Sequence, residues 1–310
     1  MNNPPLATFV VITYNQAHLI GEALAGLRAQ DYRPLEVVLT DDCSTDATPD
    51  IIRRSIAEDD WGTIDVRLMT GDCNIGIAAN FERGLRAAQG EVIVVGGGDD
   101  ISLSSRVSES VRLLTQDDRR VMLHFAATII DDDGNEVGRK GPDEEFEITD
   151  FDRLFAGKPC GFGATRAFKT IVRDRFPPLG PGAPFEDFPY LMRSLHLGSV
   201  LNVPSLQVEY RVGNGSASAA DNINIDHMIA EFEQLVTDAR LALEGDASFA
   251  FFEKFLPYYG SLVLKMRIGA KVAAGRRVDF GEVMRFLAIK QADFREKAGL
   301  VRYWLKGAFR

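Results

Sequence analysis

Two adjacent carboxylates, Asp99 and Asp100, are the first residues in this chain that could do chemistry. They follow the apolar run 91–95 and the three glycines 96–98. Neighbouring carboxylates repel each other, and a hard divalent cation with oxygen ligands relieves that repulsion. The pair therefore suggests a metal-assisted phosphate or diphosphate site. The alternative is a Gly-Asp-Asp turn that only caps the next helix.

The elements around this pair predict a parallel sheet. The run 91–95 is typical of a strand buried on both faces. Three similar strand patterns precede it, and amphipathic helical patterns separate them: strands at 8–13, 35–40 and 64–69, helices at 17–29, 47–56 and from 74 to a C-cap at Gly90. This alternation predicts a doubly wound α/β sheet. Polar clusters follow the first, second and fourth strands, at the sheet edge where such folds bind ligands.

The pattern changes after Asp100, and the expected elements become mixed. They are a helix at 104–114, a strand at 121–130, a hairpin turn at 133–135, a loop at 140–147, a short helix at 151–155, a loop at 177–184, a helix to Leu197, strands at 200–203 and 206–210, and helices from 223 onward. The segment 161–165 contains two glycines and has the permissive backbone that lines pockets.

Composition limits the class of protein. The chain has 310 residues and a formal charge of −10, which argues against a general nucleic-acid binder. Residues 254–310 hold thirteen Lys and Arg against four Asp and Glu, a net of +9, which leaves −19 for residues 1–253. The three cysteines form no CxxC pair, and neither a signal-peptide pattern nor an apolar run of about 18 residues is present. We therefore expect a cytoplasmic protein with free thiols.

Five blocks together resemble the family 2 glycosyltransferases, over about residues 1–215. They are Val10 to Asn15, Glu36 to Asp46, Asn74-Ile75-Gly76 with Asn80 and Gly84, Gly90-Glu91 with Gly97 to Asp100, and Glu186-Asp187 with Arg193. Each block alone is a weak signal, and the joint match is specific. The resemblance implies a GT-A fold, a Rossmann-like and mostly parallel central sheet with helices on both faces. It further implies a nucleotide-binding half at 1–100, an acceptor-binding half at 101–215, and a basic helical extension at 216–310.

The family resemblance also implies roles for single residues. Asp187 would be the general base of an inverting transfer from a nucleotide-diphospho-sugar, and Asp99 would bind Mn²⁺ or Mg²⁺. The other donor-binding positions would be Thr13, Tyr14, Asn15, Asp41, Asp42, Asn74, Gly98, Asp99, Asp100 and Glu186. Among them Tyr14 would offer an aromatic face, Asp41 would accept from a ring N–H, and Asp42 would brace that loop or add to the contact.

This chain departs from the family pattern at three places. Gly97 stands where the first Asp of the Asp-x-Asp motif is usual, Ala79 where many members have Arg, and Val212-Gly213-Asn214 where many carry a His. The first departure leaves open a non-catalytic member that binds nucleotide-sugars or scaffolds an assembly. A dinucleotide oxidoreductase is a weak alternative, because no GxGxxG follows the first strand.

Plainer interpretations stand beside the functional ones. Tyr14 suits an ordinary strand end, Asp41 and Asp42 suit a turn, and Glu186-Asp187 suits a helix N-terminus. The resemblance also implies the partners, which would be a UDP-linked donor and a saccharide or lipid-linked saccharide acceptor of surface-polysaccharide assembly. For the basic tail, a solvated helical surface and a peripheral contact with the inner face of a membrane are two alternative interpretations.

Overall fold

The computed structural model describes residues 3–149, 161–180 and 183–213, together with separate positions between 230 and 301 that include 276–288. The chain divides into two compact units, residues 1–219 and 220–310. The predicted domain boundary at residue 215 stays a prediction, and the helix expected at 151–155 lies outside the described residues.

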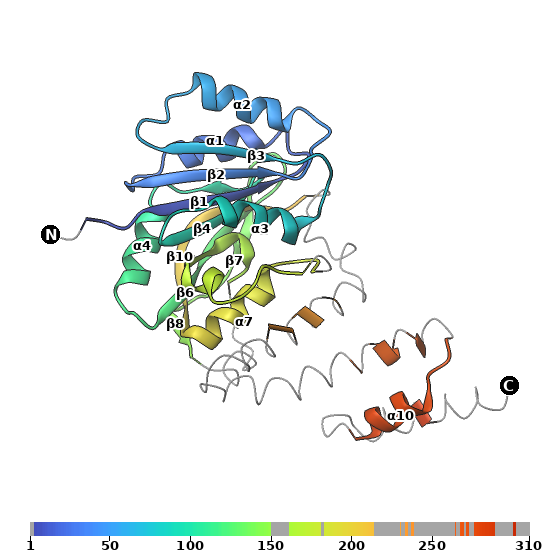
Figure 1. Ribbon diagram of the computed structural model, residues 1–310. Coiled ribbons are helices and arrows are strands. Elements are labelled where there is room, and N and C mark those ends of the chain that lie inside the picture. Colours follow the sequence, from blue (N-terminus) through green and yellow to red (C-terminus); the bar gives the residue numbers. More distant parts are fainter. Residues whose placement is uncertain are drawn as a thin grey trace. The chain divides into compact units, whose positions relative to one another are not determined.

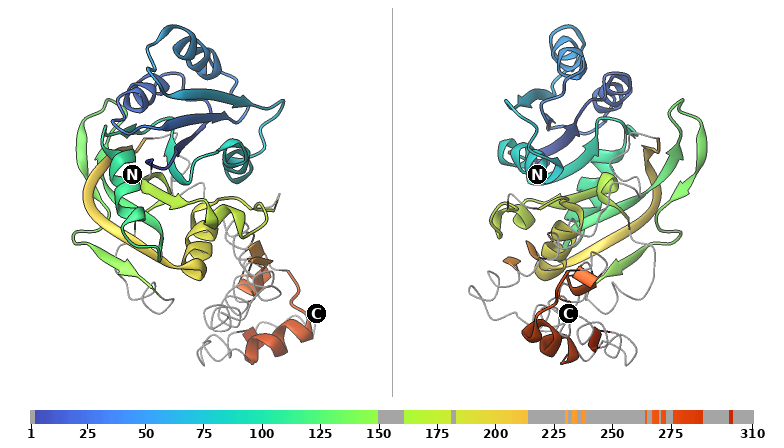
Figure 2. Two further views of the ribbon diagram at one scale, coloured as in Figure 1. Left: turned by 60° about the vertical axis from the view of Figure 1, so that its left-hand side comes forward. Right: turned by 90° about the vertical axis from the view of Figure 1, so that its right-hand side faces the viewer.

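One sheet runs through the first unit (Figures 1 and 2). Its strands follow the order β3-β2-β1-β4-β9-β6-β10-β5, with β7 beside β6 and β8 beside β10. The strands are β1 (Ala7–Thr13), β2 (Leu35–Asp41), β3 (Asp65–Thr70), β4 (Val92–Gly97), β5 (Ile101–Ser102), β6 (Arg120–Ile130), β7 (Glu136–Lys140), β8 (Phe146–Ile148), β9 (Arg166–Lys169) and β10 (Ser199–Arg211). The first four are mutually parallel, which confirms the predicted doubly wound half.

Helices cover both faces of this sheet. They are α1 (Ile20–Arg28), α2 (Thr48–Glu58), α3 (Ile77–Ala87), α4 (Arg106–Thr115), the short η1 (Gly163–Thr165), α6 (Ile171–Asp174) and α7 (Asp187–Leu197). Alternate strand residues face opposite sides. Phe9 therefore packs in one core with Leu24 of α1, while Val10 faces α3. There Gly84 lies so close that an added Cβ would be 2.8 Å from Val10 Cγ1.

Three sequence-based element predictions are wrong. The strands expected at 200–203 and 206–210 are one strand, β10, whose register shifts between Val203 and Leu206. Pro204 lies inside this shift and has no N–H to donate to the ladder, which explains the apparent break. The loop expected at 140–147 contains the end of β7 and the start of β8.

Gly90 is not the C-cap of α3, which ends three residues earlier at Ala87. Its backbone N–H donates to Thr8 Oγ1 at 2.8 Å. An added Cβ would lie 2.6 Å from the backbone nitrogen of Thr8. Glycine is therefore needed here because two backbone segments approach each other closely.

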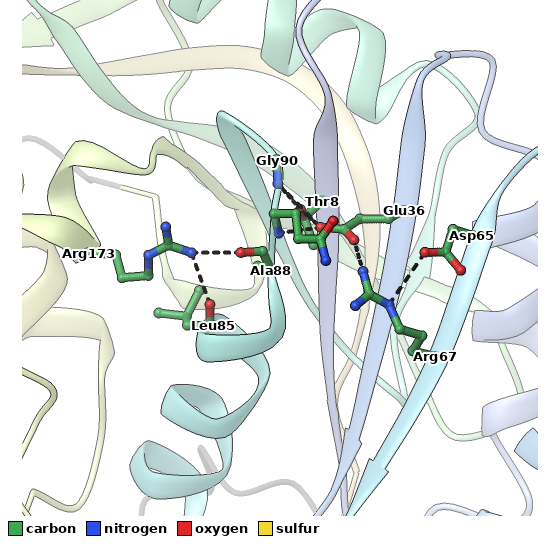
Figure 3. A network of polar contacts seen from close by, with 9 residues as sticks. Thr8, Glu36, Asp65, Arg67, Leu85, Ala88, Gly90 and Arg173 are labelled. Carbon is green, nitrogen blue, oxygen red and sulfur yellow. Dashed lines mark hydrogen bonds and ion pairs between the residues drawn. The ribbon is translucent and has the colours of Figure 1, made fainter.

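A buried carboxylate closes the edge of the sheet where β1, β2 and β3 begin (Figure 3). Glu36 is 2% exposed and accepts hydrogen bonds from Thr8 Oγ1, the backbone of Gly90 and a guanidinium nitrogen of Arg67. Arg67 also lies 3.5 Å from the exposed Asp65. Buried polar groups are stable when they are paired in this way. The opposite edge holds the polar clusters discussed below.

In the second unit, α10 (Phe280–Leu287) begins with a capping box. Asp279 Oδ1 accepts from the backbone of Glu282 at 2.9 Å, and Glu282 Oε2 accepts from the backbone of Asp279 at 3.1 Å. Within the described residues, no helix is both long and apolar enough to span a bilayer. Cys43 and Cys73 are free thiols, and Cys160 lies outside the described residues.

Candidate active site

The loops that follow β1 and β2 interlock at one edge of the sheet. Asn15 has a positive φ of 52°, a conformation that asparagine tolerates better than most residues. Its backbone N–H donates to Ser44 Oγ at 2.8 Å, and its side-chain oxygen accepts from the backbone of Thr45 at 2.8 Å. Two of the polar clusters predicted to share an edge are thus in direct contact.

Asp41 ends β2 and is 1% exposed. Its Oδ1 accepts from Thr13 Oγ1 at 3.0 Å and from Ser44 Oγ at 2.6 Å, and its Oδ2 accepts from the backbone of Ser44 at 2.8 Å. These bonds hold the turn together. A direct contact from Asp41 to a nucleotide base stays a prediction, and it would require the Ser44 turn to move.

Asp42 braces the loop that follows β3. Its two carboxylate oxygens accept from the backbone N–H groups of Ile75 and Gly76 at 2.8 and 2.9 Å. Asn74 Oδ1 also accepts from the backbone of Gly76, at 3.2 Å. Asp42 is 4% exposed, so its place in this structure is that of a scaffold. Among the large apolar residues of these loops, Tyr14 is 45% and Ile75 is 42% exposed.

The turn after β4 carries Asp99 and Asp100. Gly98 donates its N–H to the backbone of Ile12 at 3.0 Å, which fixes the turn against the end of β1. Burial raises the pKa of the half-buried Asp99 carboxyl, while a hydrogen bond from the Gln16 side chain favours its charged form. Burial and the neighbouring charge of Asp99 raise the pKa of Asp100 to about 8. The two carboxylates therefore disfavour each other's ionisation.

Gly97 makes room for these carboxylates. A Cβ added at Gly97 would lie 2.6 Å from Asp99 Oδ1 and 3.1 Å from Asp100 Oδ2. Any side chain at this position would displace one or both groups. Gly97 is where this chain departs from the family pattern. In the structure, the carboxylates of Asp99 and Asp100 occupy the space that a side chain at residue 97 would need.

The donor set suits a hard divalent cation in part. Among the described residues, no group of three His, Cys, Asp or Glu side chains is arranged to hold a metal ion. Asp99 and Asp100 both direct an oxygen toward the position of a residue-97 side chain, and the pKa of each is raised. Mg²⁺ and Mn²⁺ accept oxygen ligands, and Mg²⁺ is commonly held by one or two carboxylates plus substrate phosphates. Asp99 and Asp100 could supply carboxylate oxygens to such a cation, and donor phosphates would have to supply further ligands.

Arg211, at the end of β10, ties this turn to three other parts of the first unit. It is 3% exposed, and its backbone N–H donates to Asp100 Oδ1 at 3.1 Å. Its guanidinium donates to the carbonyl of Asp99 at 3.1 Å, to the carbonyl of Asp131 at 2.8 Å and to Glu22 Oε2 at 2.6 Å. The position of the Asp99 backbone therefore depends on the β6–β7 turn and on α1.

The second carboxylate pair begins α7 and is held by a buried arginine. Arg166 Nη1 donates to Asp187 Oδ1 at 2.6 Å, and its Nη2 donates to Glu186 Oε1 at 2.8 Å. The side chain of Asp187 is 53% exposed, while that of Glu186 is 6% exposed. Burial and the charge of Asp187 raise the pKa of Glu186 to about 7, against the opposing effect of Arg166. Of the two, Asp187 is the one that an acceptor could reach.

His124 lies beside Arg166, on the neighbouring strand β6. It is 4% exposed, and its Nδ1 has no hydrogen-bond partner. Burial and the nearby Arg166 cation lower its pKa to about 3. His124 is therefore neutral at physiological pH, and Arg166 is the cation at this point of the sheet.

The segment around η1, whose Gly163 lies against Asp187, contacts the strands next to the Asp99 turn by two routes. On one side, Arg106 donates to the carbonyl of Ala164 in η1 at 2.6 Å and to the carbonyl of Val95 in β4. On the other, the rings of Phe162 and Tyr210 lie 4.7 Å apart, and Tyr210 directly precedes Arg211. These contacts fix η1 and the adjacent Phe162 to β4 and to the end of β10, which both lie next to the Asp99 turn. That Asp187 and Asp99 face a single cleft stays a prediction.

Sequence reasoning missed three residues that shape this site. They are Gln16, Arg166 and Arg211. Gln16 bonds to the Asp99 side chain, Arg211 to the Asp99 carbonyl, and Arg166 to Asp187. For Arg166 the one available signal was the Glu186-Asp187 pair itself, because two adjacent acids beside a buried strand need a cation nearby. The sequence does not say which of the 35 lysines and arginines supplies it.

Two of the relatives found by sequence comparison match part of this chain. A protein of unknown function from Mycobacterium tuberculosis, Rv1520, is 36% identical over 129 residues, which are 41% of this chain and 36% of the relative. The GalNAc(5)-diNAcBac-PP-undecaprenol beta-1,3-glucosyltransferase of Campylobacter jejuni is 27% identical over 155 residues, 49% of this chain and 48% of the relative. The chain thus spans less than half the length of these two relatives.

Among solved structures, residues 1–349 of Staphylococcus aureus TarS in complex with UDP-GlcNAc superimpose with a TM-score of 0.60 at 18% identity. The match covers 97% of this chain and 78% of TarS 1–349. At this identity it supports the fold, which is that of the GT-A glycosyltransferases expected from the sequence. The sequence profile described as "Glycosyl transferase family 2" matches residues 8–175, more than half of the chain. The chain therefore belongs to glycosyl transferase family 2.

Proposed function

We propose that this chain is an inverting glycosyltransferase that moves a sugar from a nucleotide-diphospho-sugar, a UDP-sugar, to a saccharide or lipid-linked saccharide acceptor. The observation that carries the proposal is the state of Asp187. It is a half-exposed carboxylate that is held by a buried arginine and lies against Gly163 of η1. Ala164 of η1 and the adjacent Phe162 in turn contact Arg106 and Tyr210, next to the Asp99 turn. The surroundings of Asp187 suit a base that must be both accessible and fixed.

The proposed reaction is a single displacement at the anomeric carbon. Asp187 takes the proton of the acceptor hydroxyl as the oxygen forms its bond to that carbon. The bond to the diphosphate breaks on the opposite face, and the nucleoside diphosphate leaves with the electron pair. Attack from the opposite face inverts the configuration.

Asp99, with Asp100 beside it, would hold a divalent cation such as Mn²⁺ or Mg²⁺ together with the donor phosphates. A bound cation of this kind stabilises the negative charge of the leaving diphosphate. Tyr14 would lie against the base, and the loops of Asn15 and Asn74 against the ribose side. The buried Asp41 and Asp42 support these loops from below.

The first test is nucleotide release. The protein is incubated with a set of UDP-sugars, with and without Mn²⁺ or Mg²⁺, and Asp187→Asn is compared with Asp174→Asn as a matched control. Asp174 is equally exposed and paired with an arginine, but it lies on α6. Loss of a general base costs about 10² to 10⁴ in rate, so Asp187→Asn should lose turnover while the control keeps it.

The competing class is a non-catalytic member that binds nucleotide-sugars or scaffolds an assembly. A thermal-shift assay distinguishes it, because a ligand that binds the folded state raises the melting temperature. A donor that stabilises the protein and is never turned over, whatever the metal and acceptor, would support the binder and refute the enzyme.

For the acceptor, we further propose that the second unit meets the cytoplasmic face of a membrane in surface-polysaccharide assembly. Residues 254–310 carry a net charge of +9. On α10, Phe280 and Met284 are 61% and 50% exposed one turn apart, beside the exposed Arg285. Apolar anchors flanked by basic groups favour anionic bilayers.

Co-sedimentation with phosphatidylglycerol vesicles should therefore exceed that with phosphatidylcholine vesicles. Combining Phe280→Ser with Met284→Ser should reduce it. Equal recovery from both kinds of vesicle, with or without the substitutions, would contradict the membrane contact.

A further inference from the structure

We infer that Arg166 is a positioning residue of this enzyme: its buried guanidinium and the backbone of Gly163 together hold the Asp187 carboxylate in one orientation. The inference deepens the proposed function, because it rests on Asp187 as the base. It assigns a role to two residues that lie 21 and 24 positions before the base in the sequence.

The first contact comes from the guanidinium. Its two terminal nitrogens are divided between two carboxylates, Nη1 on Asp187 Oδ1 at 2.6 Å and Nη2 on Glu186 Oε1 at 2.8 Å. A planar guanidinium presents its N–H groups in a fixed fork, so two such bonds fix the direction of both acceptors. A lysine ammonium in the same place would be a point charge on a flexible stem and could not span the pair in this way.

The guanidinium itself cannot move away. Its side chain is 1% exposed, and its carbon lies 4.8 Å from the ring centre of Phe81 in α3 and 6.0 Å from that of Tyr190 in α7. The tyrosine hydroxyl is in turn held by Glu82 at 2.9 Å. Contacts of this kind between cations and ring faces are favourable when they are buried. Arg166 therefore provides a rigid support between the two helices.

The second contact comes from Gly163. A Cβ added at this glycine would lie 1.9 Å from Asp187 Oδ1 and 2.5 Å from Oδ2. The carboxylate therefore rests against the bare backbone of η1 as well as against the arginine. Alanine at this position would push the carboxylate away without changing any charge.

With both contacts in place, the Asp187 side chain is still 53% exposed, whereas that of its neighbour Glu186 is 6% exposed. A general base needs a carboxylate that the acceptor can reach, and of the two acids only Asp187 is exposed in this way. A proton acceptor has to be within about 2.6–3.2 Å of the hydroxyl that it serves, and a displacement of about 1 Å can cost about 10²-fold in rate. These contacts on Asp187 are separate from the hydrogen bonds that hold the Asn15 and Asn74 loops, so their loss should affect turnover and leave donor binding intact.

Two variants of the full chain test the inference from independent directions, Arg166→Lys and Gly163→Ala. Arg173→Lys is the matched control, because Arg173 also donates to two carbonyls, those of Leu85 and Ala88 (Figure 3), and to a carboxylate, that of Asp174. Both test variants should lower kcat by about 10²-fold, with the KM for the UDP-sugar unchanged. The control should retain wild-type values. Added methylguanidine should restore part of the activity of an Arg166→Ala variant, which a purely structural role would not predict.

Retention of kcat within about twofold in both test variants would overturn the inference while leaving the proposed function intact. If the wild-type protein turns over no donor, the proposed function fails. Melting temperatures then test whether Arg166 holds Asp187. The shift produced by combining Arg166→Lys with Asp187→Asn should then differ from the sum of the two single shifts. Additive shifts would show that the guanidinium does not hold Asp187.

Discussion

His124 makes this fold sensitive to acid. Burial and the adjacent Arg166 lower its pKa to about 3, whereas an unfolded chain has a histidine pKa near 6.5. Between these two values the unfolded state binds one more proton than the folded state. The free energy of unfolding therefore falls as the pH falls through this range.

The size of the effect follows from the pKa difference. Each pH unit below about 6.5 costs about 1.36 kcal/mol, so the contribution of His124 at pH 5 is a loss of about 2 kcal/mol. Asp100 and Glu186 act in the opposite direction, since their raised pKa values make the folded state bind more protons. The pH dependence of the wild-type unfolding free energy is therefore the sum of opposing contributions, and a variant is needed to isolate that of His124.

His124→Leu removes the titrating group from the same buried position. Urea unfolding at pH 7 and pH 5 should show the variant gaining about 2 kcal/mol relative to wild type between the two conditions. NMR of the imidazole protons gives a direct check, since only four histidines are present and the His124 signal should not move above pH 5. A wild-type minus variant difference that is flat with pH, or a His124 signal that titrates near pH 6.5, would refute the reasoning.

Two further predictions concern the edge of the sheet that Figure 3 shows. Glu36→Leu leaves Arg67 and the hydroxyl of Thr8 without their buried acceptor and should lower the unfolding free energy by about 3–5 kcal/mol. The urea midpoint measures this, and Asp65→Asn at the exposed end should cost less than about 1 kcal/mol. Gly90→Ala should destabilise because its Cβ would meet the backbone of β1, whereas Gly21→Ala, with open space around it in α1, should stabilise by about 0.5–1 kcal/mol. Equal melting temperatures for the two alanine variants would contradict the close approach at residue 90.

The periodic parts of the chain were predictable because local pattern and burial agree there. The run 91–95 lies in the middle of the sheet, flanked on both sides, and its apolar residues report that burial directly. The same agreement holds for the strands at 8–13 and 35–40. By contrast, β10 was divided in two because Pro204 breaks the local pattern, whereas the pairing of the whole strand with β6 depends on distant residues.

The acidic residues of the candidate site could be predicted from the sequence, whereas the arginines that hold them could not. Carboxylates that follow predicted strands can be assigned to a site from the sequence, because a parallel sheet brings the ends of its strands to one edge. The arginines that hold them come from positions without a local signal, Arg166 at the start of a four-residue strand and Arg211 at the end of a long one. Their assignment depends on tertiary contacts between residues separated by 20 to 190 positions.

The bonds from Asp42 to the amides of Ile75 and Gly76 have a consequence for how a donor can lie. These amides precede α3, and a helix N-terminus normally attracts phosphate. Here the protein supplies its own anion at that position, so a diphosphate approaching from the α3 side would meet repulsion. The uncharged base and ribose would then occupy the side of the first two loops, and the pyrophosphate would point toward β4 and β10. A donor complex with a phosphate oxygen on the amides of residues 75 and 76 would contradict this orientation.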